Sequence, residues 1–158
     1  MAESEKRLLL ESEAFEAGKP IPSRYTADGP DRSPALSWRG VPAQARSLAL
    51  VCEDPDAPRG NWVHWVLYGI PPSTTSLPEA VPPSASLPGG GTHGKNDFGR
   101  LGYGGPAPPS GTHRYFFRLY AIDVPLALPA GATRAELTRA IEGHVLARGE
   151  LMGTYSRR

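Results

Sequence analysis

Acidic and imidazole side chains gather in two short segments of the chain. Asp54 and Asp56 flank a proline in the segment CEDPDAPRGNWVHW, where His64 follows within an aromatic run. His113 and Tyr115 stand two positions apart in a later segment, so in a strand they point to the same face. If the two segments pair in one sheet, these groups form a small polar cluster at one end of it. Strand ends suit a functional site, because a rigid scaffold holds the side chains.

Metal binding and nucleophilic catalysis are two chemistries that such a cluster could perform. Histidines and aspartates can ligate zinc or iron, but the chain has no HxH, HExxH or CxxC motif. No GxSxG motif supports a nucleophilic serine, and Ser110 lies in a predicted turn. The single cysteine, Cys52, lies in an apolar run and is predicted to be a small core residue. We therefore expect neither a protein-bound metal nor a cofactor.

Anion binding fits the cluster best. Residues 102–106, GYGGP, offer backbone N–H groups with little side-chain obstruction, which suits a small oxyanion. Two bare carboxylates would repel phosphate. A carboxylate that accepts a hydrogen bond from one imidazole nitrogen instead fixes the tautomer and favours the cation, so the other nitrogen can donate to the anion. A carboxylate could also accept from a protonated phosphate or from the ammonium group of a zwitterionic ligand.

Four apolar runs are typical of strands that could position these residues. Each is rich in leucine, β-branched or aromatic residues, and turn-forming segments separate them. We expect strands at residues 6–12, 46–54, 61–70 and 114–123. The loop between the last two strands, roughly residues 71–112, is long, and long loops in compact domains are usually functional.

Strand alternation also predicts which side chains share a face. Within residues 61–70, His64 is expected on the same face as Trp62, Val66 and Tyr68. All three tryptophans are expected in the core. The two remaining histidines are predicted to be structural, one in a glycine-rich loop and one beside a helix. The tryptophans are Trp38, Trp62 and Trp65, and these histidines are His93 and His144.

One helix is predicted near the C-terminus, over residues 133–148. Thr133 and Glu136 form a capping box at its start, and Gly149 is expected to end it. The apolar stripe of this helix consists of Leu137, Ala140, Ile141 and Val145. Residues 150–156 could form a last strand. One helix after many strands predicts a mainly β sandwich or barrel-like domain, with the helix packed outside.

Composition sets the broad class of the protein. The 158 residues include 39% apolar and 21% charged residues, which predicts a single globular domain over residues 1–158. A net charge of +1 without a basic run argues against a nucleic-acid partner or broad attraction to anionic lipid. A lone cysteine fits a reducing compartment. With neither a signal-peptide pattern nor a transmembrane stretch in the sequence, we expect a cytoplasmic location.

Several separated motifs occur in order along nearly the whole chain. DPDAP is followed by VHWVLYGIP and then by GKNDFGRLGYGGPAPPSGTHRY. Further matches are AFEAGKPIPSRYTADGPDRSPALSW near the start, and FFRLYAID and GHVLARGELMGTYSR near the end. In these motifs the chain resembles the phosphatidylethanolamine-binding proteins, most closely their short prokaryotic branch, described as Raf kinase inhibitor-like.

The resemblance implies a mainly β sandwich. A large central antiparallel sheet would pack against a smaller sheet, with peripheral helices, one of them near the C-terminus. It also implies a cis peptide between Ala57 and Pro58, because a sharp reversal after Asp56 would turn both carboxylates toward one pocket. That pocket would bind phosphate-like anions or phospholipid head groups. Its residues would be Asp54, Asp56, His64, Gly105, Pro106, His113 and Tyr115, with Tyr103 as a weaker candidate.

The same resemblance implies a non-enzymatic binding or regulatory protein. Inhibition of a kinase or a protease is a known theme of the family, but no feature of this sequence identifies such a partner. A homodimer is compatible with the resemblance. The alternative is a phosphate-ester hydrolase or transferase that uses His64 and His113 as acid and base. The chain lacks an obvious nucleophile or metal set for that reaction, which favours binding.

Overall fold

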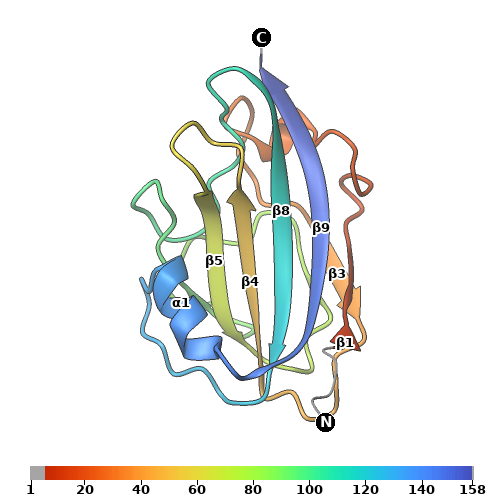
Figure 1. Ribbon diagram of the computed structural model, residues 1–158, viewed down its shortest axis with the longest axis vertical. Helices are drawn as coiled ribbons and strands as arrows, with labels where there is room; N and C mark the ends of the chain where they lie inside the picture. Colours follow the sequence, from red (N-terminus) through yellow and green to blue (C-terminus); the bar gives the residue numbers. More distant parts are fainter. Residues whose placement is uncertain (1–5, 158) are drawn as a thin grey trace.

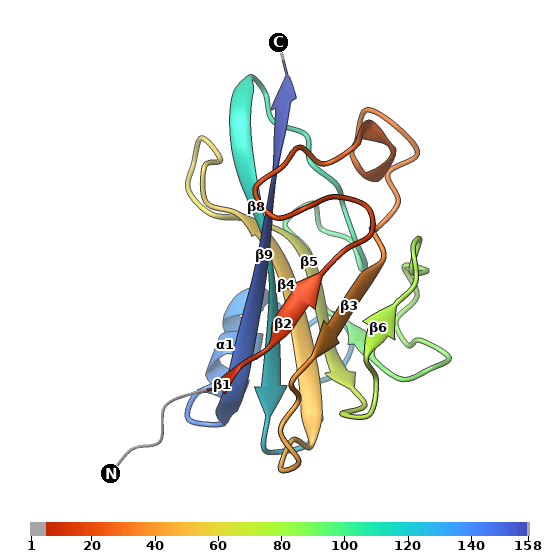
Figure 2. The same cartoon turned by 90° about the vertical axis from the view of Figure 1, so that its right-hand side faces the viewer.

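Two β-sheets form the framework of the protein, and a short helix lies outside them (Figures 1 and 2). The computed structural model describes residues 6–157. The large sheet has six strands in the order β1-β9-β8-β4-β5-β7, and the small sheet has three in the order β2-β3-β6. This arrangement confirms the predicted mainly β fold with a large sheet, a smaller sheet and a helix near the C-terminus.

The long strands follow the apolar runs of the sequence, whereas β3, β6 and β7 lie outside the predicted strands. The large sheet contains β1 (Lys6–Arg7), β4 (Ser47–Asp54), β5 (Trp62–Ile70), β7 (Thr92–His93), β8 (Gly111–Ile122) and β9 (Val145–Arg157). The small sheet contains β2 (Leu9–Glu11), β3 (Leu36–Arg39) and β6 (Ser76–Leu77). All neighbouring strands are antiparallel except β1 and β9, so the large sheet is mixed at one edge rather than wholly antiparallel.

β4 is buried along its whole length because both of its faces are covered. Leu48, Leu50 and Cys52 face the small sheet and belong to the core between the sheets. Ala49 and Val51 belong to a second apolar cluster under the helix. A strand buried on both faces needs apolar residues at every position, which is why this segment is a continuous apolar run rather than an alternating one.

The helix α1 (Arg134–Ile141) covers the face of the large sheet opposite the small sheet (Figure 2). The predicted capping box is confirmed, because the Thr133 hydroxyl accepts from the Glu136 N–H and the Glu136 carboxylate accepts from the Thr133 N–H. Leu137 and Ile141 are buried against the second apolar cluster. Within residues 6–157, this helix is too short and too polar to cross a membrane, and no other helix could do so.

The predicted end of the helix at Gly149 was wrong. The helix ends at Ile141, and Gly143 with φ of +80° takes the left-handed conformation that redirects the chain. Val145 then pairs with Ile122 in the sheet instead of extending the apolar stripe of the helix. The expected last strand at residues 150–156 is confirmed as part of β9, which begins five positions earlier than predicted.

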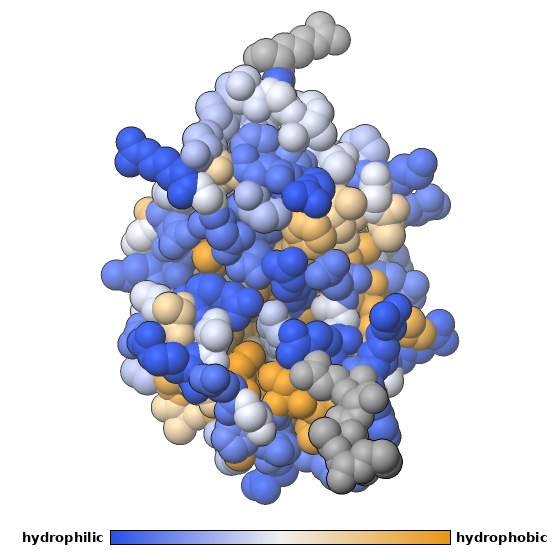
Figure 3. All heavy atoms as spheres, in the orientation of Figure 1, coloured by the Kyte–Doolittle hydropathy of each residue, from blue (hydrophilic) through white to orange (hydrophobic). Residues whose placement is uncertain are grey.

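Hydrophilic side chains cover most of the sheet face that carries α1 (Figure 3). Arg114 and Arg118 from β8 lie on this face with their guanidinium groups over the ring of Phe116, at 5.4 and 4.7 Å from its centroid. Arg118 also forms ion pairs with Glu53 at 2.6 Å and with Glu150 at 3.1 Å. These contacts give this part of the sheet a charged outer surface.

The predicted strand at residues 6–12 divides between the two sheets. β1 pairs with β9 in the large sheet, and β2 pairs with β3 in the small sheet. At the crossing, the Leu8 N–H donates to the Arg148 carbonyl at 2.9 Å, and Leu8 is buried. Gly149 permits this close approach, because a Cβ there would lie 2.6 Å from the Leu8 carbonyl oxygen.

We predict that Gly149→Ala destabilises the protein by about 1–3 kcal/mol, because the new methyl group meets backbone that cannot move aside without shifting a strand. Gly89→Ala is the matched control, since a Cβ at Gly89 would meet nothing within 4 Å. Its effect should stay within about 0.5 kcal/mol. Urea unfolding of both variants measures this difference, and equal stabilities would contradict the packing argument.

Candidate functional site

A cavity of about 300 Å³ opens where β4 ends and where β5 and β8 begin, at the upper end of these strands in Figure 1. Four of the predicted site residues line it: Asp54, His64, His113 and Tyr115. The complete lining consists of Asp54, Ala57, Pro58, Arg59, Trp62, His64, Phe98, Ala107, Pro108, Pro109, His113 and Tyr115. The structure therefore brings together side chains from three strands and from the long loop before β8.

A β-bulge places His64 at this cavity. Cys52 pairs with Trp65 and Glu53 pairs with Val63, so His64 has no partner residue on β4. The extra residue shifts the alternation, and His64 lies on the side of the large sheet that faces the core between the sheets. Val66 and Tyr68 pack under the helix on the opposite face. The predicted face shared by His64 with these two residues was therefore wrong, although Trp62 does line the same cavity as His64.

The tautomer of His64 is fixed by a backbone carbonyl. Its Nδ1 lies 2.6 Å from the Gly104 carbonyl oxygen, and since a carbonyl can only accept, Nδ1 carries a proton. Nε2 makes no hydrogen bond to any residue from 6 to 157. Burial lowers the pKa of His64, although hydrogen bonding to Gly104 and the carboxylates of Asp54 and Asp31 act in the opposite direction. At neutral pH the ring is therefore uncharged, and its Nε2 is an acceptor.

His113 is held by a carboxylate, as the sequence suggested for one of the histidines. Its Nδ1 lies 2.6 Å from Oδ2 of Asp54, and both side chains are at most 9% exposed. The other carboxylate oxygen of Asp54 accepts from the Asp56 N–H at 2.8 Å. Both oxygens of Asp54 are thus occupied by the protein, and Nε2 of His113 is the ring nitrogen left for a ligand.

Asp56 faces away from the cavity and binds Arg114. The two side chains form a bidentate ion pair with both distances at 2.9 Å, and the Arg114 N–H also donates to the carboxylate at 3.0 Å. These hydrogen bonds lower the pKa of Asp56 from 3.8 to about 2. The structure gives Asp56 a role in holding the loop after β4 against β8, rather than the predicted place in the pocket lining.

The predicted cis peptide between Ala57 and Pro58 was wrong, because no cis peptide bond occurs in residues 6–157. Side-chain and backbone hydrogen bonds reverse the chain instead. The Asp54 carboxylate accepts from the Asp56 N–H, and the Gly60 N–H donates to the Ala57 carbonyl at 3.0 Å, with φ of +105° at Gly60. This turn still places Ala57 and Pro58 in the cavity wall.

Gly104 and Gly105 lie outside the cavity lining, and their N–H groups are bound within the protein rather than available to an anion. The Gly104 N–H donates to the His64 carbonyl at 2.9 Å, and the Gly105 N–H donates to the Asp31 carboxylate at 2.8 Å. A Cβ at Gly105 would collide with the Asp31 side chain and with the Tyr25 carbonyl. The predicted anion cradle in residues 102–106 therefore has at least two of its N–H groups already engaged.

Pro106 and Tyr103 also lie outside the cavity lining. The Pro106 carbonyl accepts from the Ala27 N–H at 3.0 Å. The Tyr103 hydroxyl donates to the Tyr25 carbonyl at 2.6 Å, and its ring packs edge-on against Trp65. These contacts fix the segment that continues into Ala107, Pro108 and Pro109, which do line the cavity.

Tyr115 brings an unsatisfied hydroxyl to the site. The side chain is fully buried, and its hydroxyl has no hydrogen-bond partner among residues 6–157. Burial and the nearby Asp54 carboxylate raise the pKa of Tyr115, so the hydroxyl keeps its proton at all relevant pH. Its ring packs edge-on against His64 at 5.2 Å. A buried donor without a partner in a cavity wall is a position where a ligand oxygen could bind.

The aromatic side chains at the mouth were missed by the sequence argument. Trp62, predicted to be a core residue, is 36% exposed, and Phe98 is 37% exposed. Their rings meet edge-on at 5.5 Å, and Phe98 also contacts His64. The other two tryptophans are buried as predicted. Trp62 lies next to the bulge in β5. Its position two residues before His64 was the one feature of the sequence that could have placed it at the cavity.

The other two histidines have structural roles as expected, although His93 lies on β7 rather than in a loop. His93 is buried, accepts from the Trp65 indole N–H at 3.0 Å through Nε2, and has Nδ1 at 2.7 Å from the Ser84 carbonyl. His144 pairs with Asp123 at 2.8 Å on the surface. Both are satisfied by the protein outside the cavity. Among residues 6–157, no group of three or more His, Cys, Asp or Glu side chains is arranged to hold a metal ion.

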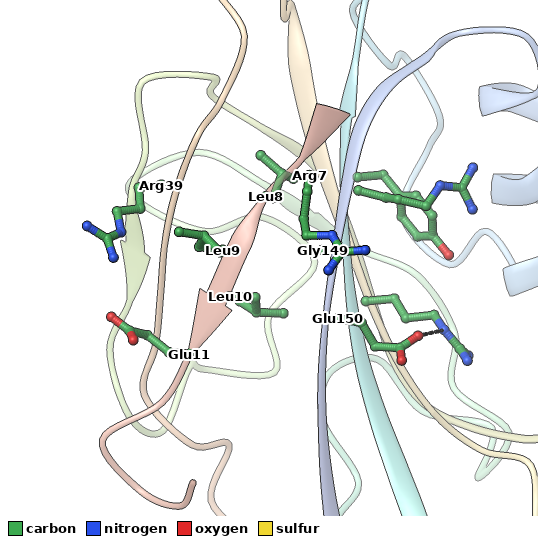
Figure 4. Close-up of a pocket in the computed structure, with 11 residues that line it drawn as sticks. Arg7, Leu8, Leu9, Leu10, Glu11, Arg39, Gly149 and Glu150 are labelled. Atoms are coloured by element: carbon green, nitrogen blue, oxygen red, sulfur yellow. Dashed lines mark hydrogen bonds and ion pairs between the residues drawn. The ribbon is translucent and has the colours of Figure 1, made fainter. Parts of the chain in front are cut away.

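A larger cavity, of about 590 Å³, lies where the chain crosses from β1 to β2 (Figure 4). Leu9, Glu11 and Arg39 lie on one side of it, with Gly149 and Glu150 on the other. None of the predicted site residues lines this cavity, and the Arg118–Glu150 ion pair already joins charges across its wall. The cavity near the ends of β4, β5 and β8 is therefore the better candidate.

A family model described as phosphatidylethanolamine-binding protein matches residues 11–156. The chain belongs to the phosphatidylethanolamine-binding protein family. This confirms the resemblance seen in the separated sequence motifs. Family membership supports a binding or regulatory role in general terms.

Relatives of this family member cover nearly its whole length. It is 55% identical over 148 residues to a UPF0098 protein from Methanothermobacter thermautotrophicus, a match that covers 94% of this chain and 98% of the relative. The crystal structure of CT736, a putative phosphatidylethanolamine-binding protein homolog from Chlamydia trachomatis, has a TM-score of 0.88 and 40% identity, with coverage of 97% and 99%. That of YbcL from E. coli, described as a new member of the mammalian family, has a TM-score of 0.89 and 29% identity, with coverage of 96% and 99%.

We predict that Asp56 stabilises the protein only above the acid range. Since its pKa is lower in the folded protein, this contribution is present above about pH 3.8 and is lost as the pH falls toward 2. The stability difference between wild type and Asp56→Asn should therefore shrink over that range. Urea unfolding at neutral pH and at steps between about pH 4 and 2 measures it.

Arg114→Gln supplies the matched test of this ion pair. It should reduce the same acid-range dependence of stability to the part that comes from the Arg114 N–H, and the effects of the two changes on stability should not be additive in the double variant. A stability difference between wild type and Asp56→Asn that stays constant down to about pH 2 would contradict the assignment.

Proposed function

We propose that the protein is a non-enzymatic binding module whose cavity takes the oxyanion head of a small ligand, such as a phosphate-like group or a phospholipid head group. One observation carries the proposal. Three groups, His64 Nε2, His113 Nε2 and the Tyr115 hydroxyl, belong to side chains that line one cavity, while each imidazole is already fixed through Nδ1. The cavity is of a size that suits a head group rather than a whole lipid.

An anion needs hydrogen-bond donors, and the protonation of His64 decides whether this site supplies them. Because Nδ1 of His64 already donates to Gly104, Nε2 donates only when the ring is a cation. Binding of an anion therefore raises the pKa of His64 from its lowered value in the free protein. The carboxylates that act on His64 are Asp54 and Asp31, and Asp56 also lies close enough to act on His113; all three already accept hydrogen bonds from the protein.

Binding is favoured over turnover by the composition of the cavity wall. Of the residues described, those that line it include no serine, threonine, cysteine or lysine. A hydrolase or transferase with His64 and His113 as acid and base is the alternative. Incubation with a panel of phosphate esters separates the two, because the alternative requires turnover that disappears in His64→Ala.

We predict that sulfate binds with an affinity that depends on pH. Sulfate keeps a fixed charge where phosphate monoesters titrate, near pH 6. Affinity should be highest below the lowered pKa of His64 and should fall by about tenfold per pH unit above it, for one coupled proton. Calorimetry between about pH 4.5 and 8 measures this profile.

Histidine variants identify the groups responsible. His64→Ala and His113→Ala should each weaken sulfate binding, and His64→Ala should flatten the pH profile. His144→Ala is the control, because His144 pairs with Asp123 away from the cavity. A flat profile in the wild-type protein would show that uncharged groups hold the anion, and unchanged binding in both cavity variants would refute the site.

The unsatisfied hydroxyl of Tyr115 gives a separate prediction. Tyr115→Phe should weaken sulfate binding by about tenfold, because one donor to a charged acceptor is lost. The free energy of unfolding should stay the same or rise, since the variant removes a buried hydroxyl that has no partner.

Tyr103→Phe is the matched control for this change. Its hydroxyl donates to the Tyr25 carbonyl outside the cavity, so this variant should lose stability and keep sulfate affinity. Wild-type affinity in Tyr115→Phe, measured by calorimetry, would show that the hydroxyl does not face the anion.

A further inference from the structure

A zwitterionic head group carries an ammonium, and the carboxylates around the cavity are already used. Asp54 accepts from His113 and from the Asp56 N–H, one hydrogen bond at each oxygen. Both oxygens of Asp56 accept from Arg114. Asp31 accepts from the Gly105 N–H. Asp54 is the one carboxylate among the described residues that line the cavity, so an ammonium that left water here would have to share oxygens already engaged by His113 and Asp56, which is unfavourable.

An exposed arginine, Arg59, lies in the cavity wall without an ion pair to any described residue. Its guanidinium has no ion pair or side-chain hydrogen bond with any residue that the structure describes, whereas Arg114 is held by Asp56. Arg59 is therefore the cation available to meet a group that projects from the bound anion.

Aromatic rings could in principle attract an ammonium, since cations are stabilised over ring faces. Here the rings of Trp62 and Phe98 meet edge to face, with their centroids 5.5 Å apart. The guanidinium of Arg100 already lies over the Phe98 ring, 5.6 Å from its centroid. A ligand ammonium at this mouth would thus compete with one arginine and face a second, Arg59.

The remaining wall is apolar. Ala57, Pro58, Pro108 and Pro109 surround the opening together with the two rings. An alkyl or aryl substituent on the oxyanion would lose contact with water against this wall, which is favourable in proportion to the area covered. The mouth therefore complements an apolar substituent, and Arg59 complements a second acidic group.

We propose that this site selects oxyanions that carry an apolar or acidic substituent and discriminates against those that carry an ammonium, with Arg59 as the specificity-determining residue. The inference rests on the proposed anion-binding function. It states that the ethanolamine type of head group, despite the family's name, is a poor ligand for this particular chain.

Three small sulfonates test this preference with charges that stay fixed near pH 6. Propane-1-sulfonate and taurine have nearly the same shape and differ by a methyl group in place of an ammonium, and sulfoacetate carries a carboxylate. Their affinities for the full-length protein are measured by calorimetry. We expect sulfoacetate to bind at least as tightly as propane-1-sulfonate, and taurine to bind about twofold to fivefold more weakly than propane-1-sulfonate, as for single exposed charge contacts.

Arg59→Gln tests the assigned residue. In this variant sulfoacetate should weaken by about twofold to fivefold, and taurine should bind more tightly than it does to the wild type. Arg46→Gln is the matched control, because Arg46 is exposed at the opposite end of the sheet, where its N–H donates to the Ile122 carbonyl. That variant has the same change in net charge and should leave all three affinities unchanged.

The outcomes separate this inference from the proposed function. Equal affinities for the three sulfonates, or tightest binding of taurine, would overturn the selectivity while the anion site stands. Selectivity that Arg59→Gln leaves unchanged would overturn the role of Arg59. If neither sulfate nor any sulfonate binds at any pH tested, the proposed function itself fails, and the selectivity fails with it.

Discussion

A buried hydrogen bond between His113 and Asp54 holds together the parts that build the cavity. It joins the end of β4 to the start of β8 through a contact of 2.6 Å between two nearly inaccessible side chains. A carboxylate taken out of water must be paired and hydrogen-bonded, or its burial is very costly. Asp54 meets this requirement with one oxygen on His113 and the other on the Asp56 N–H, so the same residue fixes an imidazole and starts the turn after β4. Arg114 then secures this turn by binding Asp56.

The long strands of the large sheet could be predicted from the sequence, but most of the short strands could not. β4 and β5 could be recognised because strands in the middle of a sheet bury apolar side chains along almost their whole length, and β8 because it is rich in aromatic and aliphatic residues. β3, β6 and β7 were missed because strands of two to four residues have little or no periodicity to detect. The helix was extended too far because Val145 fits an apolar stripe as well as it fits a strand. Its pairing with Ile122 depends on a residue distant in the sequence, which local spacing does not reveal.

Within the site, it was easier to predict which residues take part than which way their side chains point. His64, His113, Asp54 and Tyr115 were identified correctly as residues of one cluster. The orientation of His64 required knowledge of a bulge, because one extra residue reverses the face of every side chain after it. Asp56 was assigned to the cavity because it lies next to Asp54, yet its strongest electrostatic partner lies on β8. Such a choice between two partners depends on tertiary contacts, which motifs alone do not specify.

The protonation state of the polar groups in the cavity decides which of them donate hydrogen bonds and which accept them. With His64 uncharged, its Nε2 is an acceptor, whereas the Tyr115 hydroxyl is a donor. Each proton taken up converts an acceptor into a donor and adds a positive charge, without any movement of the backbone. Under the proposed function, an anion would bind together with the proton that makes the site complementary to it. Burial lowers the pKa of His64, so the free protein rests in the form that does not favour anions. A buried hydroxyl without a partner costs stability, and under the proposed function a ligand oxygen would supply the missing partner of Tyr115.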